Sequence, residues 1–362
     1  MKHPVMPVSM KDKRKPDELV RFYAPKVAVA PRQVDWVKYA PMAFNQDSRQ
    51  KCVGAAFAEL MAYDAAGAGE IPAGLPLYFS TWWIYNWARW MRGWLNEDCG
   101  SYPEDAATAI CEHGLMPYTL WPCKRDEFGT IAMDTTDPHR TGAIQFPNTN
   151  KARIDNGVEG LTLALAEGPV SIAVPWFDKW GSSYKSGVLP PILDQQISGR
   201  HCIVFDGHDM DKGLFYGPNS WGEWGIKESA LGERESRCGF AMPFEYIELF
   251  KSKFGGYDAW DIDHDKVPPL PDMNFTLITH TTEGTDIVGC PARISLEINA
   301  GKKSGYTFSR WRPGNNINNP YSADTFITML DDAEVSAYFT KNKAKRCDLF
   351  LQALLANKAQ GI

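Results

Sequence analysis

The first strong hydrophobic pattern in the chain begins at Cys52. Apolar side chains recur there at the i, i+3, i+4, i+7 and i+8 positions, namely Val53, Ala56, Phe57, Leu60 and Met61. This spacing puts them on one face of a helix, so the sequence predicts a helix over residues 52–63. Two more helices are predicted, over residues 77–95, which are rich in tryptophan and tyrosine, and over residues 103–113, which end before Gly114.

Strand patterns dominate the later part of the chain, with apolar runs at 170–174, 202–207 and 213–217. The stretch 258–273 is rich in Asp and Pro and lacks apolar periodicity, so it is predicted to be a linker. Alternating segments beyond it predict a small β-rich module over 274–340, followed by a helical tail over 341–362. A polar N-terminal arm over 1–30 then leaves one main domain over 31–257.

Composition narrows the function classes. The chain has 362 residues, 44% of them hydrophobic and 23% charged, which are globular proportions, and a net charge of −6. A dedicated nucleic-acid binder would show a basic excess, so no nucleic-acid partner is expected. No apolar run reaches the ~18 residues that a membrane span needs. The N-terminus lacks the apolar region of a signal peptide, which favours a virion-associated setting or a non-classical extracellular route.

The eight cysteines include no CxxC pair, so neither a zinc ribbon nor a thioredoxin-like site is expected, and we expect no metal and no cofactor. Cys52 differs from the others because it stands at a predicted helix start, where N–H groups and the helix dipole lower a thiol pKa. His201 begins a predicted strand, and Asn219 follows another. A thiol, a histidine base and an asparagine that orients the histidine form a candidate nucleophilic site. Gln46, six residues before Cys52, is a candidate donor to a substrate carbonyl oxygen.

Several runs around these residues resemble the papain-like (C1) cysteine peptidases. They are VDWVKYAPMAFNQDSRQKCVGAAFAEL (34–60), GSYPEDAATAICEHGLMPYTLWP (100–122), GPVSIAV (168–174), SGVL (186–189), RHCIVFDGHD (200–209) and NSWGEWG (219–225). The resemblance spans roughly residues 31–250. It implies an α+β, two-lobed papain-like fold, with a helical lobe that starts at Cys52 and a β-barrel-like lobe that carries His201 and Asn219, followed by the small β-rich domain.

The resemblance also implies a role for each matching residue in the hydrolysis of a polypeptide substrate. Cys52 matches the nucleophile, His201 the general base and acid, Asn219 the orienting residue, and Trp221 the indole that shields their hydrogen bond. Gln46 and the Cys52 N–H match the oxyanion hole. Gly100 and Ser101 match the strand edge that pairs with an extended substrate, and Tyr102 and Pro103 the wall of the main specificity pocket.

The chain departs from the family pattern close to the nucleophile. Arg49 stands where the family has a disulfide cysteine, Gln50-Lys51 where it has Gly-Ser, and Val53 where it has an aromatic residue. Arg49 and Val53 resemble the bacterial and phage-like branch. Arg200 directly precedes His201, and a neighbouring cation disfavours an imidazolium. About 30 residues precede the resemblance, too few for the family's long inhibitory propeptide, so either the enzyme needs no zymogen, or the arm itself plugs the cleft, or the domain is structural.

Two other function classes compete with the peptidase. A virion or cell-surface component could retain the fold as an assembly part, because residues 270–340 resemble an internalin-type B-repeat in the runs GYTFSRW and FITMLDDAEVSAYF. Such a module implies attachment partners on a virion or cell surface. The tryptophans between 82 and 94 are alternatively a carbohydrate platform, although helical spacing favours a place in the core.

Overall fold

The computed structural model describes residues 21–71, 73–74, 77–118, 129, 143–146, 149–181, 188–193, 195–234, 238–263, 274–281, 284–291, 295–304, 306–312, 317, 321–328 and 333–341. The chain divides into two compact units, Met1–Pro271 and Asp272–Ile362. Among the described helices, none combines the length and the apolar character that crossing a bilayer would require.

The central helix of the first unit, α1 (Cys52–Gly67), is buried on nearly every side, because 14 of its 16 residues are inaccessible to solvent. Six of these residues are alanines, whose small side chains let neighbouring elements approach the helix closely. At Gly54, an added Cβ would lie only 2.6 Å from the carbonyl oxygen of Thr81, at the start of the next helix. The predicted apolar stripe is therefore part of a helix that is enclosed on all faces.

Two further helices complete the helical lobe, α2 (Thr81–Trp90) and α3 (Pro103–His113). The Ser80 hydroxyl caps α2 by accepting from the Trp83 N–H at 3.3 Å. Trp82, Trp83 and Trp87 are each about 1% exposed and pack with one another and with α3. They are core residues, so the alternative of a surface carbohydrate platform is wrong for these three tryptophans.

The β lobe contains two antiparallel four-stranded sheets. The first has the order β2 (Asn150–Ile154), β8 (Asp258–Asp263), β3 (Val170–Phe177) and β4 (Ile197–Phe205). The second has the order β1 (Gln33–Asp35), β5 (Gly207–Asp209), β6 (Leu214–Pro218) and β7 (Gly239–Pro243). The remaining elements are α5 (Gly157–Leu165), α6 (Phe244–Lys253) and the 3-10 helices η1 (Val37–Tyr39) and η3 (Asp178–Trp180).

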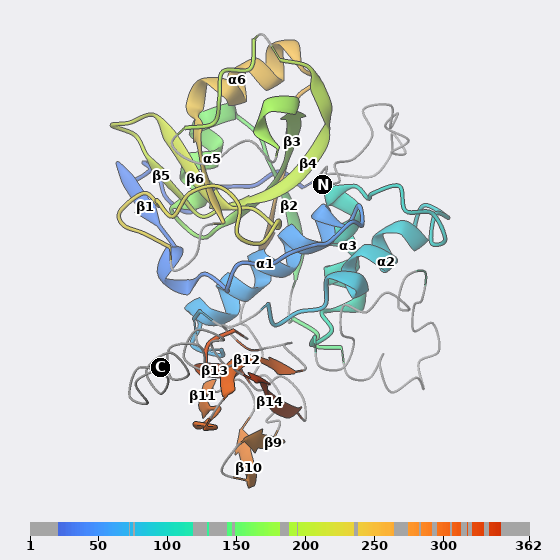
Figure 1. The fold of residues 1–362 in the computed structure, drawn as a ribbon. Coiled ribbons are helices and arrows are strands. Elements are labelled where there is room, and N and C mark those ends of the chain that lie inside the picture. Colours follow the sequence, from blue (N-terminus) through green and yellow to red (C-terminus); the bar gives the residue numbers. More distant parts are fainter. Residues whose placement is uncertain are drawn as a thin grey trace, which may run out of the picture. The chain divides into compact units, whose positions relative to one another are not determined.

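One hydrophobic core lies around α1 and the other fills the β lobe. Figure 1 shows α1, α2 and α3 grouped together, with the strands of the β lobe packed along one side of α1. Helix α1 therefore lies between the two lobes, and its first residue is Cys52.

The start of the predicted linker is instead a strand of the first sheet. β8 pairs with both β2 and β3, and Ala259 and Trp260 within it are fully buried. Its acidic residue Asp258 pairs with Arg153 of β2 at 3.5 Å and accepts from the Trp260 indole at 2.9 Å. Arg153 on the neighbouring strand and the nearby Trp260 indole satisfy the carboxylate inside a sheet, so the Asp-rich composition misled the prediction for 258–263. The rest of the predicted linker, 264–273, lies outside the described residues.

The described part of the N-terminal arm follows the outer edge of the first sheet. Phe22 bridges to Arg153 of β2, and two backbone hydrogen bonds of 2.8 Å join Arg21 and Tyr23 to the same residue. β1 then pairs with β5 in the second sheet. β2 and the His201-bearing strand β4 are the opposite edges of the first sheet, so residues 21–23 do not occupy a place beside His201.

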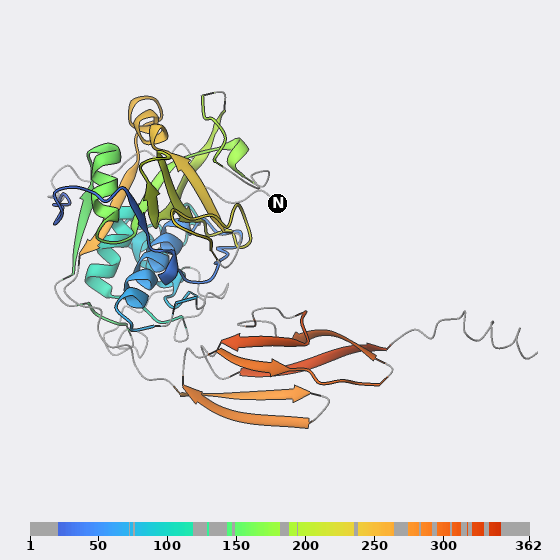
Figure 2. The same cartoon turned by 90° about the vertical axis from the view of Figure 1, so that its left-hand side faces the viewer.

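The second unit is built from strands, coloured orange to red in Figure 2. A four-stranded sheet has the order β10 (Gly284–Pro291), β9 (Asn274–Thr281), β14 (Ala333–Lys341) and β12 (Tyr306–Arg312), with β9 and β14 parallel. β11 (Ser295–Asn299) pairs with β13 (Asp324–Thr328). Trp311 is buried in this unit's core and donates to the Ser322 carbonyl at 3.1 Å. Beyond Lys341, the predicted helical tail lies outside the described residues, and the B-repeat resemblance stays a prediction.

Candidate active site

Cys52 is the first residue of α1 and is fully buried. Its sulfur accepts hydrogen bonds from the backbone N–H groups of Cys202, Val53 and Cys52 itself. Burial nevertheless outweighs these bonds and raises the pKa of the Cys52 thiol from 9.0 to about 11. The N–H groups at the helix start therefore lower the pKa of the Cys52 thiol as expected, but burial raises it by more. The bond from the Cys202 N–H places the sulfur against β4, at the residue that follows His201 in the strand.

His201 lies in β4 opposite Val174 of β3 and is fully buried. Its Nε2 lies 2.8 Å from the Oδ1 of Asn219, which is itself held by a 2.8 Å bond from its N–H to the Cys238 carbonyl. An amide oxygen only accepts, so Nε2 carries the hydrogen and Nδ1 carries the lone pair. The imidazole is therefore held in the tautomer in which Nδ1 is the basic nitrogen.

Two tryptophans enclose the imidazole of His201. The Trp221 ring lies 4.8 Å from it at an interplanar angle of 30°, and the Trp176 ring lies 4.8 Å away at 72°. The two indoles contact each other at 5.4 Å. Trp221 was expected from the NSWG run. Trp176 was missed, although it lies two residues after Val174 and therefore on the face of β3 that meets His201.

Arg200 points away from the His201 face. Its guanidinium donates to the backbone carbonyls of Gly255 at 3.5 Å and Gly256 at 2.7 Å. Successive side chains of a strand point to opposite faces of the sheet, so adjacency in sequence does not bring the cation to the imidazole. The expected repulsion between Arg200 and an imidazolium is therefore weaker than the sequence suggested.

Gln46 is fully buried and is oriented by the residue after Asn219. The Ser220 hydroxyl donates to Gln46 Oε1 at 2.5 Å, and the Gln46 backbone N–H donates to the Ser220 carbonyl at 2.8 Å. Since its oxygen is engaged by Ser220, the NH₂ group is the donor end. One bond from Nε2 goes to the Arg49 carbonyl at 3.0 Å, and an NH₂ group carries a second hydrogen.

The residues expected to bind substrate lie at the start of α3. Gly100 is buried and has φ +83°, a left-handed conformation that favours glycine. Ser101 is 1% exposed, and Tyr102 is the N-cap residue of α3, with its ring 6.0 Å from that of Trp94. Pro103 occupies the first helical turn, where its missing N–H costs nothing. Gly100 is joined to α2 by a 3.2 Å bond from its N–H to the Tyr85 hydroxyl.

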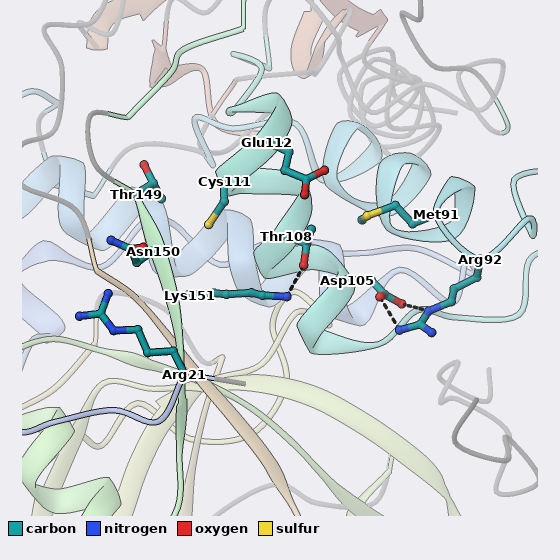
Figure 3. A pocket seen from close by; sticks show the side chains of 10 residues that line it. All are labelled: Arg21, Met91, Arg92, Asp105, Thr108, Cys111, Glu112, Thr149, Asn150 and Lys151. Atoms are coloured by element: carbon teal, nitrogen blue, oxygen red, sulfur yellow. Dashed lines mark hydrogen bonds and ion pairs between the residues drawn. The ribbon is translucent and has the colours of Figure 1, made fainter. Parts of the chain in front are cut away.

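A cavity of about 520 Å³ lies between α3 and β2 (Figure 3). It is lined by Arg21, Met91, Arg92, Asp105, Thr108, Cys111, Glu112, Thr149, Asn150 and Lys151. Cys111 and Thr108 extend from α3 toward Lys151, which donates to the Thr108 hydroxyl at 2.6 Å. Burial raises the pKa of the Cys111 thiol to about 11, and none of the ten described lining residues is a histidine that could remove its proton. Cys52 is therefore the better candidate nucleophile.

No model of a protein family matches the chain, and no curated protein does either. Among solved structures, the chain is similar to xylellain, a cysteine protease from Xylella fastidiosa, with 20% identity, a TM-score of 0.55, and coverage of 74% of this chain and 98% of that one. Two weaker likenesses are to digestive procathepsin L 3 of Tenebrio molitor larval midgut (15% identity, TM-score 0.49, 67% and 73% coverage) and to bromelain from Ananas comosus (19%, 0.45, 65% and 100%). The likeness to xylellain confirms the predicted α+β, papain-like fold.

Proposed function

We propose that the chain is a cysteine endopeptidase that hydrolyses peptide bonds through Cys52, His201 and Asn219. The observation that carries the proposal is the 2.8 Å bond between His201 Nε2 and Asn219 Oδ1, together with the hydrogen bond from the Cys202 N–H to the Cys52 sulfur. The first fixes the tautomer of the base, and the second holds the thiol beside the base's own strand. A nucleophile, a base and a group that orients the base make up the required set.

The proposed reaction assigns one step to each of these groups. His201 Nδ1 takes the Cys52 proton, and the sulfur forms a bond to the substrate carbonyl carbon. The Gln46 NH₂ group and the Cys52 N–H stabilise the oxyanion. His201 then gives its proton to the leaving amine as the C–N bond breaks, which leaves a thioester. Water, deprotonated by His201, attacks the thioester carbon; the C–S bond then breaks, the acid is released, and the Cys52 sulfur takes back the proton from His201.

The substrate is proposed to be an extended polypeptide. Its backbone would lie alongside Gly100 and Ser101 in an extended conformation and hydrogen-bond to their backbone groups, apart from the Gly100 N–H, which donates to Tyr85. Tyr102 and Pro103 would form the wall of the pocket for a neighbouring side chain. The buried, left-handed Gly100 supports this role, because glycine leaves room for a close backbone approach.

The test combines thiol labelling with turnover. Wild type, Cys52→Ala and a matched control, Cys111→Ala, are treated with iodoacetamide or an epoxide probe, and cleavage of an unfolded protein is followed. Labelling and cleavage are expected for wild type and Cys111→Ala and are lost in Cys52→Ala. A wild-type protein that neither labels at Cys52 nor cleaves would contradict the proposal.

A second candidate is a papain-fold structural or attachment component of a phage virion or a cell surface, with weak or absent catalysis. One observation favours it: Cys52 is fully buried, and its pKa is about 11, so a thiolate is scarce near neutral pH. The second unit would then supply the contact with assembly partners. The labelling experiment separates the two candidates, because a structural role needs no reactive Cys52.

A further inference from the structure

The loop before Cys52 is fixed internally by short-range bonds. Asp47 has φ +58°, and its carboxylate accepts from the Arg49 N–H at 2.9 Å and from the Lys51 ammonium at 3.2 Å. The Asp47 N–H in turn donates to Asn45 Oδ1 at 2.9 Å. These contacts shape the loop, but they do not attach it to the rest of the helical lobe. Lys51 attaches the loop to α2 through its ammonium, which lies 4.4 Å from the centroid of the Trp82 ring, and a further attachment comes from a residue far away in sequence.

Asp98 joins this loop to α2. Its Oδ1 accepts from the backbone N–H of Gln50 at 3.1 Å, and its Oδ2 lies 3.4 Å from the guanidinium of Arg49. Oδ1 also accepts from the hydroxyl of Tyr85, a buried residue of α2, at 2.8 Å. One carboxylate therefore holds the two residues that stand two and three positions before the nucleophile.

Tyr85 also connects Asp98 to the segment proposed to bind substrate, Gly100 and Ser101. The Tyr85 oxygen that donates its hydrogen to Asp98 accepts the N–H of Gly100 at 3.2 Å. Burial, which is the largest cause, and the adjacent Asp98 carboxylate raise the pKa of Tyr85, so the hydroxyl stays protonated and remains a donor. The result is a continuous chain of hydrogen bonds from the Gln50 N–H through Asp98 and Tyr85 to the Gly100 N–H.

The segment that carries Asp98 is itself braced. The buried Arg89 stacks its guanidinium on the Tyr85 ring at 4.0 Å from the centroid and donates to the Glu97 carbonyl at 2.5 Å. The hydrogen bond to Glu97 therefore holds the backbone directly before Asp98 in place. The adjacent Cys99 is a free thiol, and residues 45–51 contain no cysteine, so this tie needs no oxidation.

We propose that Asp98 is a positioning residue for the proposed peptidase reaction. It aligns the nucleophile loop with the segment proposed to bind substrate, Gly100 and Ser101. It does so by hydrogen bonds with Gln50 and Tyr85 and by an ion pair with Arg49, which stands at the position where papain-like enzymes carry a disulfide cysteine. This inference rests on the proposed function. It predicts that substitutions at Arg49 and at Tyr85 have different effects, because Arg49 belongs to the nucleophile loop and Tyr85 contacts Gly100 in the proposed substrate-binding segment.

The experiment compares Arg49→Met, Tyr85→Phe and Asp98→Ala with wild type and with Glu245→Gln, which changes an exposed carboxylate of α6. Iodoacetamide alkylation of Cys52 reports the nucleophile loop without any substrate. Turnover is measured on a peptide taken from a site cleaved in an unfolded protein, and on the same peptide shortened to one residue before the scissile bond. Enzyme concentration is corrected for the folded fraction by circular dichroism.

Arg49→Met is expected to slow alkylation and to lower kcat for both peptides, whereas Tyr85→Phe should raise KM mainly for the long peptide. Asp98→Ala should combine both effects and lower kcat/KM on the long peptide by about ten- to a hundredfold. If wild type cleaves but Asp98→Ala matches Glu245→Gln, or if Arg49→Met and Tyr85→Phe give identical profiles, Asp98 is not a positioning residue. If wild type itself neither labels nor cleaves, the proposed function fails instead.

Discussion

Replacing Glu59 with Gln is expected to stabilise the first unit increasingly as the pH rises from 5 to 8. Glu59 lies on α1, is 2% exposed, and faces a buried network in which Arg234 binds Asp206 through two 2.6 Å bonds. The Tyr63 hydroxyl donates to the same Asp206 carboxylate at 2.6 Å. Arg234 is thus already neutralised by Asp206, which leaves Glu59 as the surplus carboxyl group.

The magnitude follows from the pKa of Glu59. Burial, opposed by Arg234 and assisted by Asp206, raises that pKa from 4.5 to about 8. The folded protein therefore keeps a proton that the unfolded chain releases between these two pH values, and stability falls as the pH rises. The full loss is about 5 kcal/mol at about 1.36 kcal/mol per tenfold change in proton affinity. Most of that loss, roughly 3–4 kcal/mol, falls between pH 5 and pH 8.

The amide introduced by Glu59→Gln cannot ionise and has nearly the same shape as the protonated glutamic acid, so the variant should escape this loss. The assay is urea unfolding followed by tryptophan fluorescence, which reports the first unit because Trp311 alone of the 13 tryptophans lies beyond Pro271. The control is Glu245→Gln on the exposed surface of α6. A difference in unfolding free energy between Glu59→Gln and wild type that stays constant from pH 5 to pH 8 would refute the reasoning.

Three further results are expected. Asn219→Ala should lower kcat/KM, measured per folded molecule, by about ten- to a hundredfold, because His201 loses the group that orients it; an unchanged kcat/KM would show that Asn219 does not orient the base. Trp176→Ala should lower kcat more than Trp176→Phe, because Phe keeps an aromatic ring against His201; equal losses in both variants would argue against this contact. Arg234→Met should cost about 3–5 kcal/mol in urea unfolding, because it leaves the Asp206 carboxylate buried without its cation, and a cost under about 1 kcal/mol would mean that water replaces it.

The sequence was most informative where function constrains short runs of residues. The NSWG run led to Asn219 and Trp221, and both lie against His201 in the structure. The predicted α+β, papain-like fold is confirmed by the likeness to xylellain. Local signals also set α3 at Pro103–His113, because a proline in the first turn and a glycine after the last are strong boundary residues.

The sequence was least informative where a distant partner changes the meaning of a residue. The three aspartates of β8 indicated a linker, but Arg153 and the Trp260 indole satisfy Asp258 within a sheet. Helix α2 is shorter than the predicted 77–95. Phe79, before the helix, forms a β-bridge with Pro117, and residues 91–93, after the helix, form a turn. Asp98 gave no local signal at all, since its partners Arg49, Gln50 and Tyr85 come from two segments that are distant in sequence.

Burial also explains why the motif alone could not give the reactivity of Cys52. The helix start supplies N–H donors as expected, yet the pKa of the thiol is about 11, so only about one molecule in 10⁴ would hold a thiolate at pH 7 if the thiol ionised into its surroundings alone. To act as a nucleophile, the buried Cys52 thiol therefore needs a nearby base that accepts its proton within the site. His201 fits this requirement, because Asn219 holds its Nε2 as a donor and thereby leaves Nδ1 basic. The activity proposed for this chain would therefore depend on the geometry of this pair, and Asn219, Trp176 and Asp98 are the residues proposed to keep that geometry.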